Sequence, residues 1–310
     1  MTGTSALRAA GVLGPRGRLD HPLGALTTYR VGGPAAVFVS VEGEDDLALA
    51  ARAVMKTDVA VLVVGKGSNL LVAEAGFPGM ALRLGSAFAT VDFDGLTVRA
   101  GGAGDLPVLA RRTAGAGLRG LEWAVGVPGS VGGGVRMNAG GHGSDIAARL
   151  ERVRVLDLAT GQDEVVHADD LALGYRRSAV RPTQVVIWAE FRLDRGDPAA
   201  ASAEVAAIVR WRREHQPGGQ NAGSVFTNPP GDSAGRLVEL AGCKGQRHGT
   251  AQVSTKHGNF IQAEPGGSAD DVAALIAEVR RRVADAAGVD LRPEVKLVGF
   301  RGTPDESVRE

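Results

Sequence analysis

Two glycine-rich segments could bring backbone N–H groups close to a phosphate. Gly65-Lys-Gly-Ser-Asn69 directly follows a short apolar, β-branched run. Gly126-Val-Pro-Gly-Ser-Val-Gly-Gly-Gly134 holds five glycines and a proline in nine residues. Glycine turns at strand ends leave backbone donors uncovered, which suits phosphate or pyrophosphate. Neither segment has the spacing of a Walker loop or a full GxGxxG motif, so a plain turn and a flexible loop stay open as alternatives.

Three further segments carry side chains suited to catalysis. In Gly174-Tyr-Arg176, an arginine beside an aromatic ring could clamp a carboxylate with both arms of its guanidinium group. Ser224 follows Gly223 in a turn and lacks the GxSxG pattern of a hydrolase serine. Its hydroxyl could instead donate a proton. Glu294 follows a proline beside an apolar run, and a half-buried glutamate can hold a proton. A surface arginine, a turn serine and a surface glutamate are the structural alternatives.

No pattern for a metal site is visible. The six histidines show no HxxH or HExxH spacing, and Cys243 stands alone. His257 lies close to Lys256 and Asn259, where either a structural histidine or a substrate ligand is possible. We therefore expect no bound metal.

The composition is that of a globular protein with an excess of glycine. The chain has 310 residues, of which 45 are Gly, 44% are hydrophobic and 23% are charged. Glycine has no three-residue period, which excludes collagen, and the apolar content excludes a disordered chain. Basic and acidic residues balance at 35 each. The chain lacks the basic excess of a nucleic-acid binder, although a local anion site remains possible.

The expected location is the cytoplasm. The N-terminal segment has no apolar stretch typical of a signal peptide, and no run approaches the 18 apolar residues of a membrane span. A single cysteine cannot form an intramolecular disulfide, which favours a reducing compartment. We expect neither membrane, nucleic acid nor protein as a partner.

The elements that must hold these segments fall into two groups. In the N-terminal part, hydrophobic patterning predicts buried strands around a helix and then a second sheet. The predicted strands are 35–41, 58–65, 153–158, 164–168 and 185–193, and the predicted helices are 44–55 and 106–114.

The composition changes near residues 196–200, where an alanine-rich stretch begins, and we expect an α+β C-terminal domain to start there. Its predicted helices are 198–214, 236–241 and one that begins after Ser268 and ends before Gly288; its predicted strands are 253–262 and 295–300. The boundary therefore separates an α/β region from an α+β region.

Taken in order, the motifs resemble those of the UDP-N-acetylenolpyruvoylglucosamine reductase (MurB) family of bacterial peptidoglycan synthesis. The resemblance extends from about residue 20 to 300, and the ordered combination is far more specific than any one motif. The matching segments are Thr28–Gly33, Val64–Asn69, Gly126–Gly133, Asn138–Gly140, Gly174–Arg176, Asn221–Phe226, Gly242–Gly245, His257–Phe260 and Pro293–Val295.

The resemblance implies an α+β fold of the FAD-binding vanillyl-alcohol-oxidase (PCMH) type. Two α/β subdomains would hold FAD between them, and a C-terminal α+β domain would cover the substrate. The implied bounds are 1–88 and 89–198 for the subdomains, 199–294 for the substrate domain, 295–300 for a strand returning to the first subdomain, and 301–310 for a tail.

The resemblance also implies non-covalent FAD, with NADPH as co-substrate. A covalent tether through His142, which lies where relatives often carry an aromatic residue, stays open. The implied cofactor-binding residues are Tyr29, Arg30, Gly65, Lys66, Gly67, Ser68, Asn69, Gly126, Pro128, Gly129, Ser130, Gly132, Gly133, Asn138 and Gly140.

The implied reaction reduces the enolpyruvyl group of UDP-N-acetylglucosamine enolpyruvate to a lactyl ether. Ser224 matches the family's proton donor, Glu294 its catalytic glutamate and Arg176 its catalytic arginine. The implied substrate-binding residues are Tyr175, Arg176, His215, Asn228 and His257. The chain resembles the shorter version of the family, because no tyrosine follows Tyr175. A flavin oxidase of the same fold and a nucleotide-binding module without redox chemistry are the rival interpretations.

Overall fold

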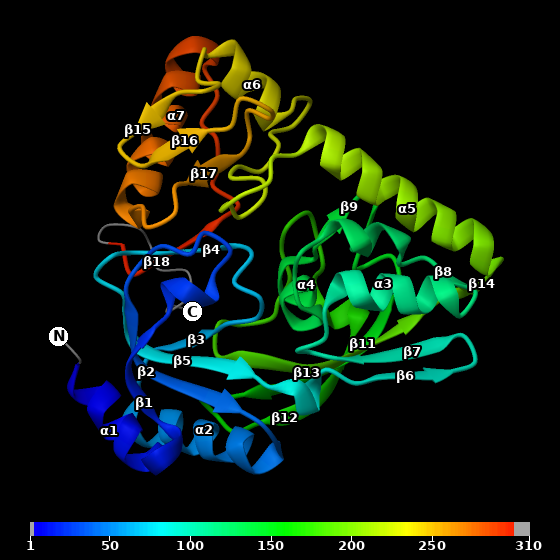
Figure 1. The fold of residues 1–310 in the computed structure, drawn as a ribbon. Helices are drawn as coiled ribbons and strands as arrows, with labels where there is room; N and C mark the ends of the chain where they lie inside the picture. The colour runs from blue at the N-terminus through cyan, green and yellow to red at the C-terminus, as the bar shows by residue number, and fades with distance from the viewer. Residues whose placement is uncertain (1–2, 301–310) are drawn as a thin grey trace.

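A computed structural model describes residues 3–300, which form three bodies (Figure 1). The first body is a four-stranded sheet in the order β1-β2-β5-β3, with two helices against it. Its elements are α1 (Thr4–Leu13), β1 (Arg18–Pro22), β2 (Pro34–Val41), α2 (Glu44–Thr57), β3 (Val61–Val63) and β5 (Phe77–Leu84). β2 and β3 both pair with β5 in parallel, so the strand–helix–strand unit brackets a third strand.

The second body is a five-stranded antiparallel sheet in the order β12-β11-β13-β7-β6, with helices over one face (Figure 1). Its elements are β6 (Val91–Asp94), β7 (Thr97–Gly101), α3 (Leu106–Gly115), the 3-10 helix η4 (Glu122–Gly126), α4 (Val131–Met137), β11 (Leu150–Asp157), β12 (Asp163–His167), β13 (Gln184–Arg192) and α5 (Pro198–His215). α5 packs Ala201, Val205 and Ile208 into the core shared with α3 and η4. The chain therefore crosses to the third body only after this helix.

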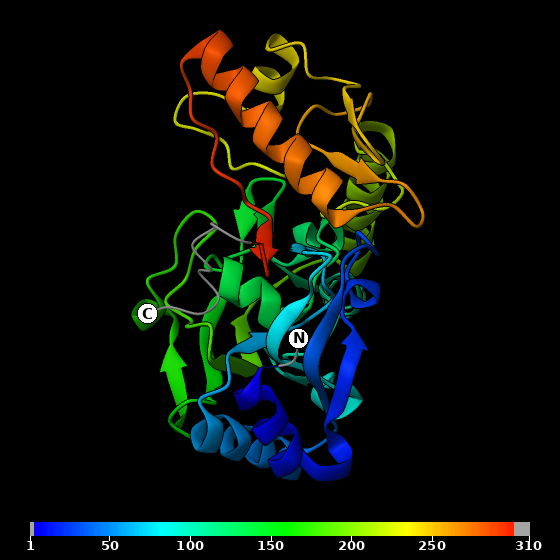
Figure 2. The same ribbon diagram turned by 90° about the vertical axis from the view of Figure 1, so that its left-hand side faces the viewer.

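The third body is a small α+β unit in which the long helix α7 lies across a three-stranded sheet (Figure 2). Its elements are α6 (Ala234–Leu240), β15 (Arg247–His248), β16 (Ala251–Val253), β17 (Ile261–Ala263) and α7 (Ala269–Ala287). Ser268 caps α7 by accepting a hydrogen bond from the Asp270 N–H at 3.1 Å, and Gly288 ends it with φ +66°. Its buried stripe of apolar residues closes the core of this body.

The chain then returns to the first body. β18 (Lys296–Val298) pairs in parallel with β4 (Leu70–Val72), and Lys296 lies opposite Leu70. This pairing places Glu294 beside the segment that follows β3. Short two-stranded pairs complete the fold: β9 (Gly140–Gly141) with β10 (Ser144–Asp145), and β8 (Leu118–Arg119) with β14 (Asp194–Arg195).

Two predicted strands differ from the structure. The run 253–262 is not one strand, because it holds the ends of β16 and β17 and a turn in which the Ser254 N–H donates to the Phe260 carbonyl at 2.8 Å. The strand expected over 58–65 is shorter, since Asp58 ends α2 in the left-handed region at φ +50°. The tail after residue 300 lies outside the described residues, and no helix among residues 3–300 is long and apolar enough to cross a membrane.

Candidate functional site

All three bodies contribute to one cavity of about 860 Å³. The first supplies the Gly65–Asn69 loop, the second the Gly126–Gly134 loop and Arg176, and the third Ser224. Glu294 enters from the segment that leads into β18. Residues far apart in the sequence thus meet in one place, as a site that joins a cofactor to a substrate requires.

The two glycine-rich loops touch each other at the cavity wall. A side chain on Gly65 would overlap the Ser130 hydroxyl, and one on Gly67, at φ +61°, would overlap the Leu26 carbonyl. Ser130 caps α4 by accepting a hydrogen bond from the Gly133 N–H at 3.2 Å. Backbone atoms and a positive φ therefore require glycine at Gly67, whereas a side chain on Gly65 would displace the Ser130 hydroxyl that caps α4.

The cavity is strongly cationic, although the whole chain has a net charge of +0. Among the residues that line it, one carboxylate, Glu294, faces six cationic side chains. These are Lys66, Arg136, Arg176, Arg212, Arg280 and Lys296. The volume and the charge fit a ligand with several negative charges, such as a dinucleotide with a pyrophosphate.

Arg176 and Glu294 form an ion pair inside the cavity. Arg176 Nε lies 2.7 Å from Glu294 Oε1, and Arg176 Nη2 donates to the Gly140 carbonyl at 3.0 Å. Arg176 has φ +57°, in a turn closed by two hydrogen bonds between Gly174 and Arg177. A left-handed backbone at a non-glycine residue costs on the order of 1 kcal/mol, and such strain often accompanies a functional position.

Burial sets the protonation of Glu294. Its side chain is only 15% exposed, and desolvation raises the pKa of the carboxyl group above its ordinary value. The charge of Arg176 and its hydrogen bond oppose this rise without cancelling it. Glu294 can therefore carry a proton at a higher pH than a surface glutamate.

Ser224 is coupled to Glu294 through the residue next to it. The Glu294 N–H donates to the Val225 carbonyl at 2.7 Å, and Phe226 forms a β-bridge with Pro293. Ser224 lines the cavity, and no described residue forms a hydrogen bond with its side chain. The hydroxyl is thus free to donate to a ligand.

Asn259 holds the segment after Ser224 in place through hydrogen bonds. The sequence patterns did not predict this function. The Asn259 side chain is buried, accepts a hydrogen bond from the Phe226 N–H at 2.9 Å and donates to the Phe226 carbonyl at 2.8 Å. Its own carbonyl accepts from the Val225 N–H at 2.9 Å. The motif His257–Phe260 could have drawn attention to Asn259, but no spacing rule reveals a clamp between segments 33 residues apart.

The expected cofactor-binding residues divide into those that line the cavity and those that do not. The lining residues are Gly65, Lys66, Gly67, Ser68, Asn69, Gly126, Pro128, Gly129, Ser130, Gly133 and Gly140. Tyr29, Arg30, Gly132 and Asn138 are not part of the lining. Tyr29 is fully buried in the core, and Asn138 donates to the Gly174 carbonyl at 2.9 Å, so it supports the turn that carries Arg176.

The expected substrate-binding residues also divide. Asn228 lines the cavity, and its N–H donates to the Tyr175 hydroxyl at 3.3 Å, which links the third body to the second. His215 is exposed outside the lining and stacks on Trp211 at 4.6 Å between ring centres. His257 packs against Phe260 outside the lining, and its Nδ1 accepts from the Asn259 N–H at 3.1 Å.

His142 lies in the cavity wall, where a left-handed backbone at φ +52° places it. Its ring meets Trp211 edge-on at 5.1 Å. Burial, aided by the charge of Arg212, lowers the pKa of His142. Among residues 3–300, no group of three or more His, Cys, Asp or Glu side chains is placed to hold a metal ion.

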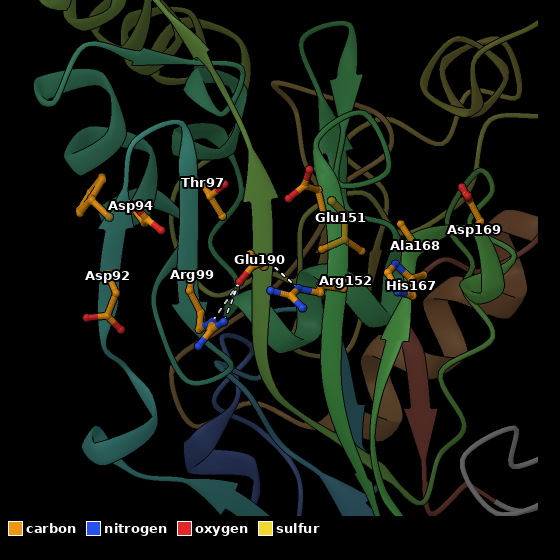
Figure 3. A pocket seen from close by; sticks show the side chains of 12 residues that line it. Asp92, Asp94, Thr97, Arg99, Glu151, Arg152, His167, Ala168, Asp169 and Glu190 are labelled. Atoms are coloured by element: carbon orange, nitrogen blue, oxygen red, sulfur yellow. Dashed lines mark hydrogen bonds and ion pairs between the residues drawn. The ribbon is translucent and has the colours of Figure 1, made fainter.

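A second hollow, on the open face of the five-stranded sheet, has a different character (Figure 3). Glu190 on β13 lies between Arg99 on β7 and Arg152 on β11. Arg99 Nη2 donates to Glu190 at 2.8 Å and Arg152 Nε at 2.6 Å. These two partners lower the pKa of Glu190. Both carboxylate oxygens of Glu190 are thus held by arginines of the sheet, which makes Glu190 a structural carboxylate.

The fold and the cavity define a flavoprotein class. The FAD binding domain family matches residues 35–168, which include the Gly65 and Gly126 loops. A berberine-bridge-enzyme-like protein from Physcomitrella patens shares the fold at 13% identity, with a TM-score of 0.55 over 90% of this chain and 89% of its own. The expected α+β fold of the vanillyl-alcohol-oxidase type is confirmed.

Closer similarities identify the family. The C-terminal domain family of UDP-N-acetylenolpyruvoylglucosamine reductase matches residues 215–298. The reductase of Paramagnetospirillum magneticum is 43% identical over 91% of this chain and 92% of its own. The reductase of Synechococcus sp. is 42% identical over 98% of this chain and 99% of its own. The crystal structure of the Thermus caldophilus reductase (MurB) has 37% identity and a TM-score of 0.80, over 91% of this chain and 99% of its own. The chain belongs to the UDP-N-acetylenolpyruvoylglucosamine reductase family.

Proposed function

We propose that this enzyme reduces the enolpyruvyl group of UDP-N-acetylglucosamine enolpyruvate to the lactyl ether of UDP-N-acetylmuramate, with NADPH as the reductant. The observation that carries the proposal is the convergence of Arg176, Glu294 and Ser224 in one cationic cavity beside the glycine-rich loops. The names of the relatives support it, since the reductases of P. magneticum and Synechococcus sp. match almost the whole chain.

The lining residues suit FAD. The Gly65 and Gly126 loops offer backbone donors for its pyrophosphate, and the excess of cations offers charge compensation. When bound and reduced by NADPH, FAD would supply the hydride that the alkene requires, which no side chain can provide. Side chains of the protein would bind the substrate's carboxylate and donate the proton.

Arg176 and Glu294 are placed to hold the substrate's carboxylate. When hydride adds to the terminal carbon, negative charge moves onto this carboxylate as an enediolate-like group. A guanidinium cation and a protonated glutamic acid stabilise that charge, and the raised pKa of Glu294 favours the protonated form. In this arrangement the Arg176–Glu294 ion pair opens to admit the substrate between its partners.

Ser224 is the proposed proton donor for the carbon that bears the ether oxygen. Hydride at one carbon and this proton at the other complete the reduction of the double bond. A serine hydroxyl has a high pKa, but the carbanion is far more basic, so Ser224 needs no unusual shift. Its side chain is free of protein hydrogen bonds among the described residues, which suits direct transfer.

Tyr175 and Asn228 are the proposed contacts with the nucleotide part of the substrate. Asn228 lines the cavity and Tyr175 is exposed beside that lining, where its hydroxyl accepts a hydrogen bond from the Asn228 N–H. His215 and His257 would reach the substrate only if it extends beyond the cavity lining. The cytoplasm is the proposed setting, because the lone Cys243 favours a reducing compartment.

Product analysis tests the proposal. We expect NADPH consumption to require the enolpyruvyl nucleotide, with one UDP-N-acetylmuramate formed per NADPH, measured by absorbance and mass spectrometry. Oxygen consumption with an alcohol substrate, and no lactyl product, would instead support a flavin oxidase. A purified protein without a flavin spectrum would support a nucleotide-binding module.

A further inference from the structure

Arg212, in the last turn of α5, is a cation of the cavity that the sequence motifs do not single out. It lines the cavity together with Trp211 and Gln216. Three other lining cations already have carboxylate partners. Lys66 pairs with Asp105 at 2.6 Å, Arg176 with Glu294 at 2.7 Å and Arg280 with Asp290 at 2.8 Å.

Arg212 has no such partner. Its one side-chain hydrogen bond runs from Nε to Gln216 Oε1 at 2.8 Å, and among residues 3–300 no carboxylate lies within ion-pair distance. Burial lowers the pKa of Arg212, as expected for a charge removed from water without an opposite charge beside it. A partly buried, unpaired guanidinium group is costly, and an incoming anion would remove that cost.

The hydrogen bond to Gln216 also orients the group. Because Nε is occupied, the four N–H bonds of Nη1 and Nη2 remain for a ligand. This planar fork matches two oxygens of a phosphate.

Arg212 lies near the glycine-rich loop of the second body. Ile208 lies one helical turn earlier, and its Cγ2 would be 3.4 Å from a side chain built on Gly126. His142, whose pKa responds to the charge of Arg212, would be 3.4 Å from the same point. Arg212 therefore stands beside the entry to the Gly126–Gly134 loop.

We propose that Arg212 binds a phosphate group in this cavity through Nη1 and Nη2, while the hydrogen bond from Nε to Gln216 orients its guanidinium group. The inference rests on the proposed function, which offers two sources of that phosphate: the pyrophosphate of FAD and the diphosphate of the sugar nucleotide. The chemistry is the same in both, and separate binding measurements distinguish them.

Arg213 provides a matched control. It is the next residue of the same helical turn, is exposed and does not line the cavity. Arg212→Met and Arg213→Met remove the same charge and keep a similar length, and both act on the same helix C-terminus. A loss that occurs only in the first variant must come from the cavity.

The experiment measures three dissociation constants on the purified full-length chain by fluorescence and calorimetry: for FAD, for riboflavin, and for UDP with the flavin-loaded protein. If the cofactor supplies the phosphate, Arg212→Met weakens FAD binding about 10- to 100-fold and leaves riboflavin unchanged. If the substrate supplies it, UDP binding weakens by a similar factor and FAD binding does not. Arg212→Lys should recover part of either loss, since it restores charge but not the fork.

FAD and UDP affinities of Arg212→Met within twofold of Arg213→Met would overturn the proposal and leave the proposed function untouched. A wild-type protein that binds neither FAD nor UDP would overturn both. A wild-type protein that binds them but forms no UDP-N-acetylmuramate would overturn the proposed function alone, while the affinities of the variants would still decide on Arg212.

Discussion

Glu190 and Glu294 are both largely covered carboxylates held by arginine, yet their acidities shift in opposite directions. Glu190 is 7% exposed and Glu294 15%. Glu190 has two guanidinium partners that are themselves nearly half exposed, at 46% and 42%. Glu294 has one guanidinium partner, follows the segment that bridges to Phe226, and has the buried residues Val225 and Val295 next to its backbone. Hydrogen bonds from arginine lower the pKa of Glu190, whereas desolvation raises that of Glu294.

The contrast shows that exposed area alone does not decide whether a carboxyl group can hold a proton. A carboxylate under a thin cover of cations remains charged and acts as a structural tie between β7, β11 and β13. A carboxyl group buried in a cavity beside a single cation has a raised pKa and can therefore be protonated. Only the second kind can serve as an acid when charge develops on a substrate.

The largest expected difference comes from neutralising each glutamate. Glu294→Gln should lower the turnover of the enolpyruvyl substrate about 10²- to 10³-fold, because it removes the acid from the site. Glu190→Gln should leave turnover within twofold and lower the free energy of unfolding by about 1–2 kcal/mol. Steady-state kinetics and urea unfolding measure the two effects, and equal turnover in both variants would contradict the different functions of the two glutamates.

The arginines beside the two glutamates should also differ in their effect on turnover. Arg176→Lys keeps the charge but loses the fork that spans a carboxylate, so we expect turnover to fall about 10²-fold. Arg99→Lys makes the same change beside Glu190 and should not alter turnover. NADPH oxidation in the presence of substrate is the measurement. A fall of similar size for Arg99→Lys would show that the sheet face contributes to the reaction.

A smaller effect is expected from loosening the support of the catalytic segment. Asn259→Ala removes both side-chain hydrogen bonds to Phe226 and should lower kcat about tenfold through misplacement of Ser224 and Glu294. Asp271→Ala is the control in the same body, because it removes two hydrogen bonds to Thr250 away from the cavity. Both variants lose stability, but only Asn259→Ala should change kcat. If kcat falls equally in the two, Asn259 has only a structural function.

The smallest effect is a difference in the pH dependence of stability. A raised pKa in the folded state stabilises the protein below the ordinary glutamate pKa, and this contribution is lost as pH rises through the raised value. The lowered pKa of Glu190 stabilises above the ordinary pKa, and that contribution is lost as pH falls through the lowered value. Relative to wild type, Glu294→Gln should therefore become more stable with rising pH and Glu190→Gln less stable, in urea midpoints from about pH 3 to about pH 7. Parallel curves would contradict the opposite shifts.

The sequence revealed parts of this site to very different degrees. Glycine runs with a proline are visible in composition, so the Gly65 and Gly126 loops could be found directly. Long amphipathic helices such as α5 and α7 followed from their period. Short elements such as α1, β5 and the split β16–β17 pair were not predicted, because tertiary pairing outweighs their weak local patterns.

Polar residues that act through distant contacts were the hardest to predict. The family resemblance implies His215 as a substrate-binding residue, yet Arg212, three residues earlier and nearly one turn away on the same helix, is the one that lines the cavity. Asn138 and Asn259 matched motifs, but their hydrogen bonds join segments that the sequence does not relate. Helix phase and long-range hydrogen bonds depend on how the bodies pack, which no local rule describes.

An experiment that separates the two halves of the reaction tests the assignment of Ser224 most directly. Under anaerobic conditions, NADPH is added to wild-type protein and to Ser224→Ala, and the flavin absorbance is followed before and after addition of UDP-N-acetylglucosamine enolpyruvate. We predict equal bleaching by NADPH in both, then recovery of the oxidised spectrum about 10²- to 10⁴-fold more slowly in Ser224→Ala. Recovery at the wild-type rate in Ser224→Ala would contradict the assignment of Ser224 as the proton donor. Failure of the wild-type flavin to recover with this substrate would contradict the proposed reaction itself.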